Sequence, residues 1–116
     1  MSDSFRIQRI QTLIREEIGK MILSDTIKDP RISNLVSVSD VHISRDIKYA
    51  KVYISGFESS KSIEKSVEAL NHANGFIQMQ LAKRLKTRNT PILSFFVDSS
   101  IKQGIDMIRK IEELNS

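Results

Sequence analysis

The hydrophobic residues in the first quarter of the chain recur every three or four positions. This spacing places them on one face of a helix, and Ser4 stands where an N-cap is expected. Asp29-Pro30 stops any continuation, because the residue before a proline is pushed out of the helical region. We therefore predict an amphipathic helix over residues 4–24. Its apolar stripe consists of Ile7, Ile10, Leu13, Ile14, Ile18, Met21 and Ile22.

The pattern changes to a two-residue alternation from residue 36 onward. Val36 and Val38 alternate on one parity. Val41 and Ile43 follow on the other parity, which indicates a bulge near Ser39-Asp40. The short connection after this run predicts that it forms an antiparallel hairpin with the next strand.

That next strand is predicted over residues 47–55, and its residues alternate regularly. The residues predicted to point inward are Ala50, Val52 and Ile54, and those predicted to point outward are Tyr49, Lys51 and Tyr53. Outward tyrosines can stack on nucleic-acid bases. They can also cover sheet surface beneath a helix, which is the more usual role, and both readings are open for Tyr49 and Tyr53.

Helical spacing returns after Gly56, in two stretches with only Ala73-Asn74-Gly75 between them. Ser60 stands where a cap of the first stretch is expected. The buried faces are predicted to contain Ile63, Val67 and Leu70 in the first helix and Ile77, Leu81 and Leu85 in the second. Three residues are too few for a flexible loop, so the pattern predicts a helix–kink–helix.

A third strand is predicted over residues 92–98, after Thr90-Pro91, and a last helix after Asp98-Ser99-Ser100. The strand is predicted to bury Leu93, Phe95 and Val97, and the helix carries the stripe Ile101, Ile105, Ile108 and Ile111. The order is αββααβα. We therefore expect residues 1–116 to form a single α+β domain, with a three-stranded sheet and helices packed on one of its faces.

The kink has a predicted geometry. Gly75 can adopt positive φ at the end of the first helix, and Asn74 can cap the second helix. Ala73 is small enough to let the two helices pack closely. The N-terminus of the second helix would then point outward and favour phosphate. The alternative is that the kink only fits two helices onto a small sheet, and both roles can hold together.

Charge is concentrated beside the kink. The chain has 18 Lys and Arg against 14 Asp and Glu, a formal net charge of +4. From Ala69 to Val97 there is no acidic residue, and this stretch contains Lys83, Arg84, Lys86 and Arg88. These four cations equal the whole surplus, which favours a surface that faces a polyanion. A solvated lysine face is the alternative.

Catalytic chemistry is poorly supported. The chain has no cysteine, and its two histidines, His42 and His72, lack metal-ligand spacing. Asp40, His42 and Ser44 lie along one strand, about 7 Å apart when they share a face, too far for a triad. We therefore expect no enzyme and no cofactor. No apolar run approaches the roughly 20 residues of a membrane span, and the N-terminus lacks a signal peptide's apolar stretch, so a cytoplasmic location is expected.

Four stretches in this order resemble the ribosome-binding factor A family of bacteria. They are KDPR (28–31), VSVSDVHISRDIKYAKVYIS (36–55), ALNHANGFIQMQLAKRLKTRNTPILSFFVDSS (69–100) and the last segment with Gly104. The order of elements is also that of a type II KH domain. The resemblance implies a non-enzymatic assembly factor that binds the free or immature 30S ribosomal subunit and its 16S rRNA. It also implies help with late maturation, including 5′-end processing, importance in the cold, and release by a ribosome-associated GTPase.

The predicted RNA-binding residues combine the kink with the basic stretch that follows it. They are Asn74, Gly75, Gln78, Lys83, Arg84, Lys86 and Arg88, with peripheral contacts from Arg6, Arg9, Lys28, Arg31 and Arg45. The GXXG loop of ordinary KH domains is absent from the sequence. We therefore expect a monomer that docks on structured RNA by shape and phosphate contacts. The alternative is a protein–protein adaptor on the ribosome without direct RNA contact. A hydrolase using His42 or His72 is a distant third.

Overall fold

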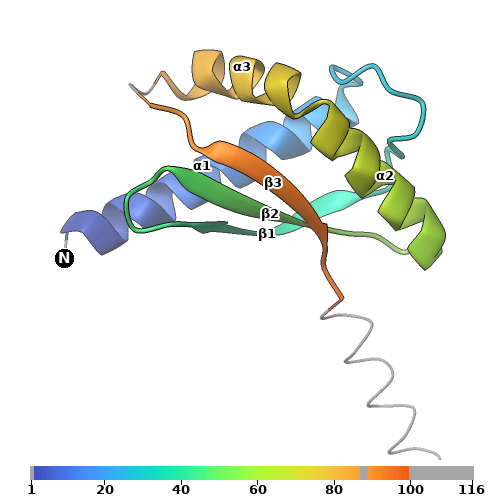
Figure 1. Cartoon of the computed structure of the whole chain (residues 1–116), viewed down its shortest axis with the longest axis horizontal. Helices are drawn as coiled ribbons and strands as arrows, with labels where there is room; N and C mark the ends of the chain where they lie inside the picture. Colours follow the sequence, from blue (N-terminus) through green and yellow to red (C-terminus); the bar gives the residue numbers. More distant parts are fainter. Residues whose placement is uncertain (1, 87–88, 100–116) are drawn as a thin grey trace, which may run out of the picture.

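A computed structural model describes residues 2–86 and 89–99 of the chain. Its elements follow the predicted order as far as the description extends, and α1, α2 and α3 lie on the same side of the sheet (Figure 1). The elements are α1 (Ser2–Leu23), β1 (Ser37–Ile43), β2 (Tyr49–Ser55), α2 (Ser60–His72), α3 (Asn74–Leu85) and β3 (Ile92–Val97). The α+β class is confirmed, and the order is consistent with a type II KH domain. The predicted last helix, with its isoleucine stripe, lies outside the described residues.

The sheet has the strand order β1-β2-β3, with β1 antiparallel and β3 parallel to β2. The register between β1 and β2 shifts between Val38 and Asp40, which confirms the predicted bulge. The extra residue restores Val41 to the same face as Val38, and both are buried. The parallel pairing of β2 and β3 requires a crossover, which α2 and α3 together provide.

The core lies between the three helices and one face of the sheet. Ile14, Ile18 and Met21 of α1 are fully buried there, as are Val52 and Ile54 of β2. The predicted inward residues of α2 and of the first two turns of α3 are buried too. The strand residues of opposite parity therefore face away from the helices.

Three local predictions are wrong. The N-cap of α2 is Ser59, whose hydroxyl accepts a hydrogen bond from the Ser62 N–H, and not Ser60. Helix α1 begins at Ser2, so Ser4 lies inside the helix and does not cap it. Val97 is 37% exposed, because the last residue of an edge strand has few neighbours to cover it.

Candidate nucleic-acid interface

The kink consists of one residue, Ala73, between the end of α2 and the start of α3. Its φ of −86° and ψ of 8° lie in the bridge region, which alanine can adopt. Helical hydrogen bonding continues through it: the Ala73 N–H donates to Ala69 O at 3.0 Å, and the Ile77 N–H donates to Ala73 O at 2.9 Å. The chain therefore changes direction without a left-handed residue.

This geometry corrects both predictions for the kink. Gly75 lies inside α3, and none of the described glycines has a positive φ. The N-cap position of α3 belongs to Ala73 and has no side-chain hydrogen bond, so Asn74 is not a cap. The expectation failed because the chain turns through the bridge region, and a positive-φ glycine is needed only when the turn passes through the left-handed region.

Asn74 instead fastens the kink to the edge strand β3. Its side-chain amide donates to Leu93 O at 2.6 Å. Asn71, one turn earlier, donates to Phe95 O at 3.0 Å and accepts from the Phe95 N–H at 2.9 Å. These amides occupy backbone groups that an edge strand would otherwise leave unpaired. The sequence contains a signal for this role. Asparagine is a poor helix former, and two asparagines three residues apart lie on the same side of a helical segment, where both can contact one strand.

The loop after α1 is fastened to the other side of the kink. The Arg31 guanidinium donates to both carboxylate oxygens of Asp29, at 3.2 and 2.9 Å. Its Nη2 also lies 3.1 Å from His72 Nδ1, which must accept because arginine can only donate. The fully buried Ser66 hydroxyl donates to Arg31 O at 3.2 Å. Arg31 therefore holds the loop against α2, and its predicted role as a peripheral RNA contact is not favoured.

These bonds also shift the ionisation of the loop. Hydrogen bonds from the Arg31 guanidinium, and then from its backbone N–H, hold the pKa of Asp29 below its ordinary value. The same pairing raises the pKa of Arg31. The two charges neutralise each other, so the exposed Lys28 beside them is the cation that this loop offers to a partner.

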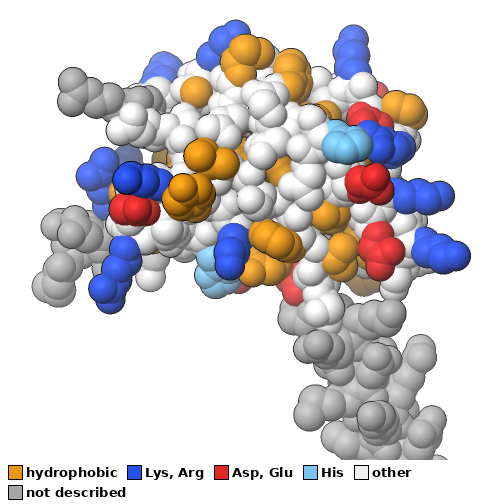
Figure 2. All heavy atoms as spheres, viewed as in Figure 1, with side chains coloured by type: hydrophobic (Ala, Val, Ile, Leu, Met, Phe, Trp, Pro, Cys, Tyr) orange, Lys and Arg blue, Asp and Glu red, His pale blue; other side chains and the backbone are white. Residues whose placement is uncertain are grey.

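The exposed side of α3 combines apolar and cationic residues. Phe76 and Met79 are 40% and 49% exposed, and Lys83 is also exposed. Spacings of three and four residues place them on one face of the helix. The exposed Lys86 follows directly after the helix, as its left-handed C-cap with a φ of 52°. On the face shown in Figure 2, no acidic side chain lies beside the basic side chains over α3, whereas acidic and basic side chains lie together over α2. We call Gly75, Phe76, Met79, Lys83 and Lys86 the α3 face.

Arg84 does not belong to the α3 face. Its Nη1 lies 3.3 Å from Glu17 Oε2 on α1, and Glu17 also pairs with Lys20 at 3.4 Å. The Arg84 side chain is only 31% exposed. The stretch from Ala69 to Val97 has no acidic residue of its own, but the charge of its Arg84 is paired with an acid that lies 67 positions earlier in the chain.

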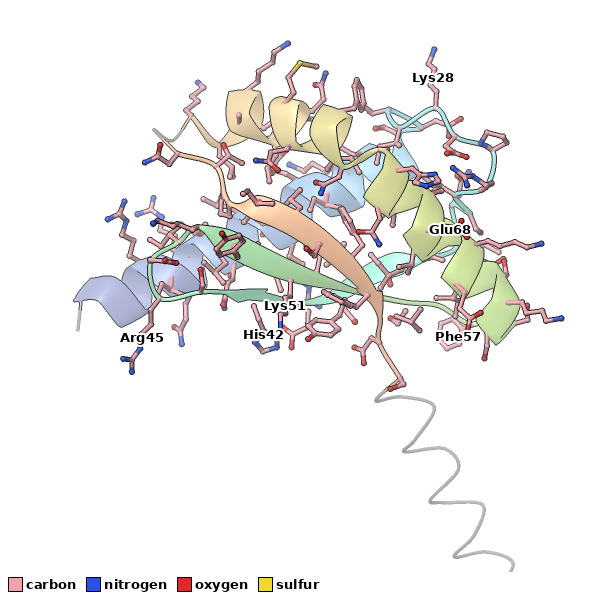
Figure 3. The ribbon with its side chains drawn as sticks, viewed as in Figure 1. Lys28, His42, Arg45, Lys51, Phe57 and Glu68 are labelled. Carbon is pink, nitrogen blue, oxygen red and sulfur yellow. The ribbon has the colours of Figure 1, made fainter. Side chains whose placement is uncertain are left out.

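The remaining predicted residues divide as follows. Gln78 is half-buried, and Arg88 lies outside the described residues. Arg6, Arg9 and Arg45 are exposed but lie on α1 and on the β1–β2 turn, away from the kink. Figure 3 places Lys28 and Arg45 at opposite margins of the molecule. Sequence reasoning missed Phe76 and Met79. Both are apolar, but they lie outside the predicted buried stripe of this helix and are exposed.

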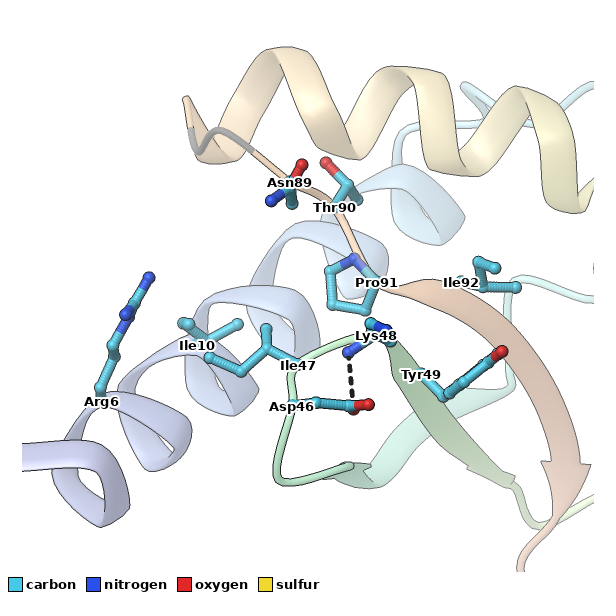
Figure 4. Close-up of a pocket in the computed structure, with 10 residues that line it drawn as sticks. All are labelled: Arg6, Ile10, Asp46, Ile47, Lys48, Tyr49, Asn89, Thr90, Pro91 and Ile92. Atoms are coloured by element: carbon cyan, nitrogen blue, oxygen red, sulfur yellow. Dashed lines mark hydrogen bonds between the residues drawn. The ribbon is translucent and has the colours of Figure 1, made fainter.

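Two hollows lie near the ends of α3. The first, of about 510 Å³, is lined by Lys28, His72 and Phe76 among others and adjoins the kink. The second, of about 600 Å³, lies where α1, the β1–β2 turn and the start of β3 meet (Figure 4). Its lining includes Arg6, Lys48 and Tyr49. Each hollow has at least one cation and one aromatic ring, the pair of groups that can hold a phosphate and a base.

Catalytic groups do not converge within the described chain. His42 Nε2 lies 2.9 Å from Asp40 Oδ2, so the prediction that strand spacing keeps these two apart is wrong. Long side chains lean along a strand and can meet. The Ser44 hydroxyl donates to Asp46 at 2.7 Å instead of facing His42, so no triad forms. In residues 2–86 and 89–99 no group of three or more potential metal ligands occurs, nor a helix long and apolar enough to cross a membrane.

Comparison with known proteins identifies relatives that match nearly the whole chain. Residues 6–111 match the family described as ribosome-binding factor A. A protein of that name from Treponema denticola is 48% identical over 110 residues, covering 95% of this chain and 83% of the relative. One from Clostridium botulinum is 43% identical over 115 residues, covering 97% of this chain and 95% of the relative.

Solved structures agree with this assignment. The crystal structure of ribosome-binding factor A from Thermus thermophilus has a TM-score of 0.67 at 25% identity, over 78% of this chain and 93% of that one. A homology model of the Thermus thermophilus factor, fitted into a cryo-electron microscopy map of its complex with the 30S subunit, has a TM-score of 0.57 at 25% identity. It covers 75% of this chain and 93% of that one.

Proposed function

The chain belongs to the ribosome-binding factor A family, and from this premise we propose that it binds the 30S ribosomal subunit through 16S rRNA. The observation that carries the proposal is the α3 face, which presents Lys83 and Lys86 beside exposed apolar side chains without a neighbouring acid. The relative from Thermus thermophilus that has been fitted into a 30S complex supports the same partner. We further propose that residues 1–116 act as one domain and that the protein works in the cytoplasm.

The contacts divide between the α3 face and the loop beside it. Lys28, Lys83 and Lys86 would neutralise phosphates, and Phe76 would stack on a base or ribose beside the hollow at the kink. Gly75 leaves the first turn of α3 open, because no atom lies within 4 Å of where its Cβ would be. An RNA backbone could therefore approach the helix N-terminus, whose partial positive charge favours phosphate.

The mode of binding is recognition of shape rather than sequence. The kink is fastened on both sides, by Asn71 and Asn74 to β3 and by His72 to Arg31. A rigid cationic helix with no GXXG loop cannot clamp a run of unpaired bases, but it can follow phosphates of a folded RNA. Structured rRNA of the immature subunit fits this requirement.

Assistance with late maturation, including 5′-end processing of 16S rRNA, is part of the same proposal. So are importance at low temperature and release by a ribosome-associated GTPase. The described residues provide no catalytic centre, so the protein would act by stabilising one rRNA conformation while other proteins process it. Binding energy alone can shift such an equilibrium, provided that the two conformations differ in affinity.

Gradient sedimentation of a cell lysate tests the proposal. The protein is expected in the fractions of free 30S subunits and not in those of complete ribosomes, and cells lacking it are expected to accumulate 16S rRNA with an unprocessed 5′ end. Sedimentation at the top of the gradient would overturn the proposal. Association that persists after nuclease digestion of the rRNA would favour the protein–protein adaptor.

A further inference from the structure

The second hollow, where α1, the β1–β2 turn and the start of β3 meet, has no part in the contacts proposed above (Figure 4). Its volume of about 600 Å³ lies within the range of small-ligand sites, which is about 300–1,000 Å³. Such sites combine apolar walls with a few polar groups. Here the apolar residues include Ile10, Ile47 and Ile92, and the charged residues are Arg6, Asp46 and Lys48. The lining therefore fits a ligand that is partly apolar and partly charged.

Ile47 has a backbone conformation that β-branched residues rarely adopt. Its φ is 59°, in the left-handed region, where a Cβ atom costs free energy. Glycine and asparagine are the usual residues where a turn requires this conformation. Ile47 is half-buried and is not among the partly buried residues that pack on the core, whereas Ile10 is. Core packing therefore does not account for the isoleucine. Its side chain lines the hollow, and strained residues recur at ligand sites.

The turn that carries Ile47 is held in shape by its own hydrogen bonds. The Ile47 N–H donates to Ser44 O at 2.9 Å, and the Ser44 hydroxyl donates to Asp46 Oδ1 at 2.7 Å. The Lys48 N–H donates to the same oxygen at 3.2 Å (Figure 4). The turn is joined to β3, where the Ile92 N–H donates to Lys48 O at 2.8 Å. This wall of the hollow is therefore formed before a ligand arrives, which reduces the entropy lost on binding.

Cations and an aromatic ring lie at the rim of the hollow. Arg6 and Lys48 are exposed, and neither forms an ion pair with any residue of 2–86 or 89–99. The Tyr49 side chain, also part of the lining, is 57% exposed. In Figure 4 Arg6 and Tyr49 lie at opposite ends of the hollow, with Ile10 and Ile47 between them. A flat apolar ring with an anionic group at one end matches this arrangement, because rings stack on tyrosine and phosphates bind guanidinium groups.

Asp46 makes the hollow unsuitable for a bare phosphate. The hydrogen bond from the Ser44 hydroxyl, and then that from the Lys48 N–H, hold the pKa of Asp46 below its ordinary value, so its carboxylate is charged at neutral pH. A charged carboxylate repels anions but has lone pairs left for N–H and O–H donors. Adenine, guanine and cytosine have amino groups, and ribose has a 2′-hydroxyl. A nucleotide combines these donors with a phosphate and therefore suits both the acid and the cations.

We propose that the second hollow binds one unpaired nucleotide of an RNA, with the base against Tyr49 and Ile47 and the phosphate at Arg6. This inference rests on the function proposed above, because it takes RNA as the partner, and it adds a contact on the opposite side of the sheet's end from the kink. One nucleotide needs no GXXG loop, which clamps about four. Bulged bases splayed out of a folded RNA are the matching feature of the ligand.

Binding of two RNA hairpins to the full-length protein, measured by fluorescence anisotropy, tests the proposal. The hairpins have the same stem, and one of them carries a single bulged adenosine. The protein should bind the bulged hairpin more tightly by roughly 5- to 150-fold, the range of one base–aromatic stack. Tyr49→Ala should remove this preference. The matched control, Tyr53→Ala, removes a ring from the same strand outside the hollow and should retain the preference.

Ile47→Gly separates a role in binding from a role in the fold. Glycine relieves the strain of the left-handed conformation, so the Tm should be unchanged or higher. The base loses an apolar contact, so the preference for the bulged hairpin should fall by roughly 5-fold. A lower Tm with an unchanged preference would assign the side chain to the fold and overturn the proposal.

Two further outcomes would also overturn it. Equal binding of the two hairpins would exclude an unpaired nucleotide as the ligand. If adenosine monophosphate shifts the amide resonances of Ile47 and Tyr49 while the hairpins bind equally, the ligand is a free nucleotide and not RNA. Binding to 30S subunits distinguishes the two proposals: loss of the hairpin preference alone refutes the role of the hollow, and absence of 30S binding refutes the proposed function.

Discussion

Neutralising Lys83 and Lys86 together is the sharpest test of the α3 face. Each lysine that neutralises one phosphate adds about 0.7 to 0.9 to the slope of log affinity against log salt, the lower value for single strands and the higher for duplexes. The variant Lys83→Gln with Lys86→Gln should therefore have a slope shallower by about 1.4 to 1.8. At about 0.1 M salt, one decade below the 1 M reference, this corresponds to binding weaker by roughly 25- to 65-fold.

The assay is equilibrium binding of the labelled protein to purified 30S subunits over a salt series at constant magnesium. The matched control is Lys61→Gln with Lys65→Gln, which removes the same charge from exposed positions on α2. This control should keep the wild-type slope within about 0.5. An unchanged slope in the α3 variant, or an equal change in the α2 control, would refute the assignment of phosphate contacts to α3.

Arg84 provides a comparison within the same helix. Its guanidinium is already paired with Glu17 at 3.3 Å and is only 31% exposed. We therefore expect Arg84→Gln to change the slope by less than half as much as one exposed lysine does. It should instead lower the free energy of unfolding by up to about 1 kcal/mol, the range of a partly exposed ion pair. A slope change equal to that of Lys83→Gln alone would mean that the pair opens on binding.

Three further variants test the kink and its anchors. Asn74→Ala removes the donor to Leu93 O and should lower the free energy of unfolding by about 1–3 kcal/mol in urea titration; no loss would show that this bond is dispensable. Gly75→Ala should be neutral or stabilise by about 0.4–1 kcal/mol, because φ is not positive and the site has room for a Cβ, and marked destabilisation would contradict this geometry. Arg31→Gln should raise the pKa of Asp29 toward about 3.9 in an NMR titration. Since the folded pKa of Asp29 is lowered, the stabilisation is fully present above the unfolded carboxyl pKa of about 3.9 and is lost as the pH falls through the lower folded pKa. The difference in stability between the two proteins should therefore shrink as the pH falls; a constant difference would argue against the pair.

The elements of the fold could be predicted because their signals are local. The two-residue alternation on either side of Ser39-Asp40 located the bulge, and the three-residue gap between apolar stripes located the kink. Both depend only on which side of a strand or helix each residue occupies. The cap of α2 was misplaced by one residue, because Ser59 and Ser60 are chemically equivalent and only the geometry distinguishes them.

The roles of individual site residues depend on partners far away in the sequence. Arg84 pairs with Glu17, and Arg31 meets His72, 41 positions later. Neither contact leaves a periodic signal, so both arginines looked like free cations when the sequence was read alone. Charge composition located the basic region, but only the packing of α1 against α3 determined which of its cations reach solvent.

The hydrogen bonds between the kink and β3 also explain why the side chains at positions 71 and 74 are neutral amides and not lysine or arginine. A lysine or arginine at position 71 or 74 would add attraction for phosphate, but it could not both donate to and accept from the edge of β3 as Asn71 does. If α3 moved freely in the unbound protein, this motion would be lost when RNA binds, and the lost conformational entropy would weaken the affinity. Placing neutral amides at the kink and cations about three turns later fixes the direction of the helix before RNA arrives. The positive charge of Lys83 and Lys86 then acts from defined positions, which is the condition for recognising a folded RNA by its shape.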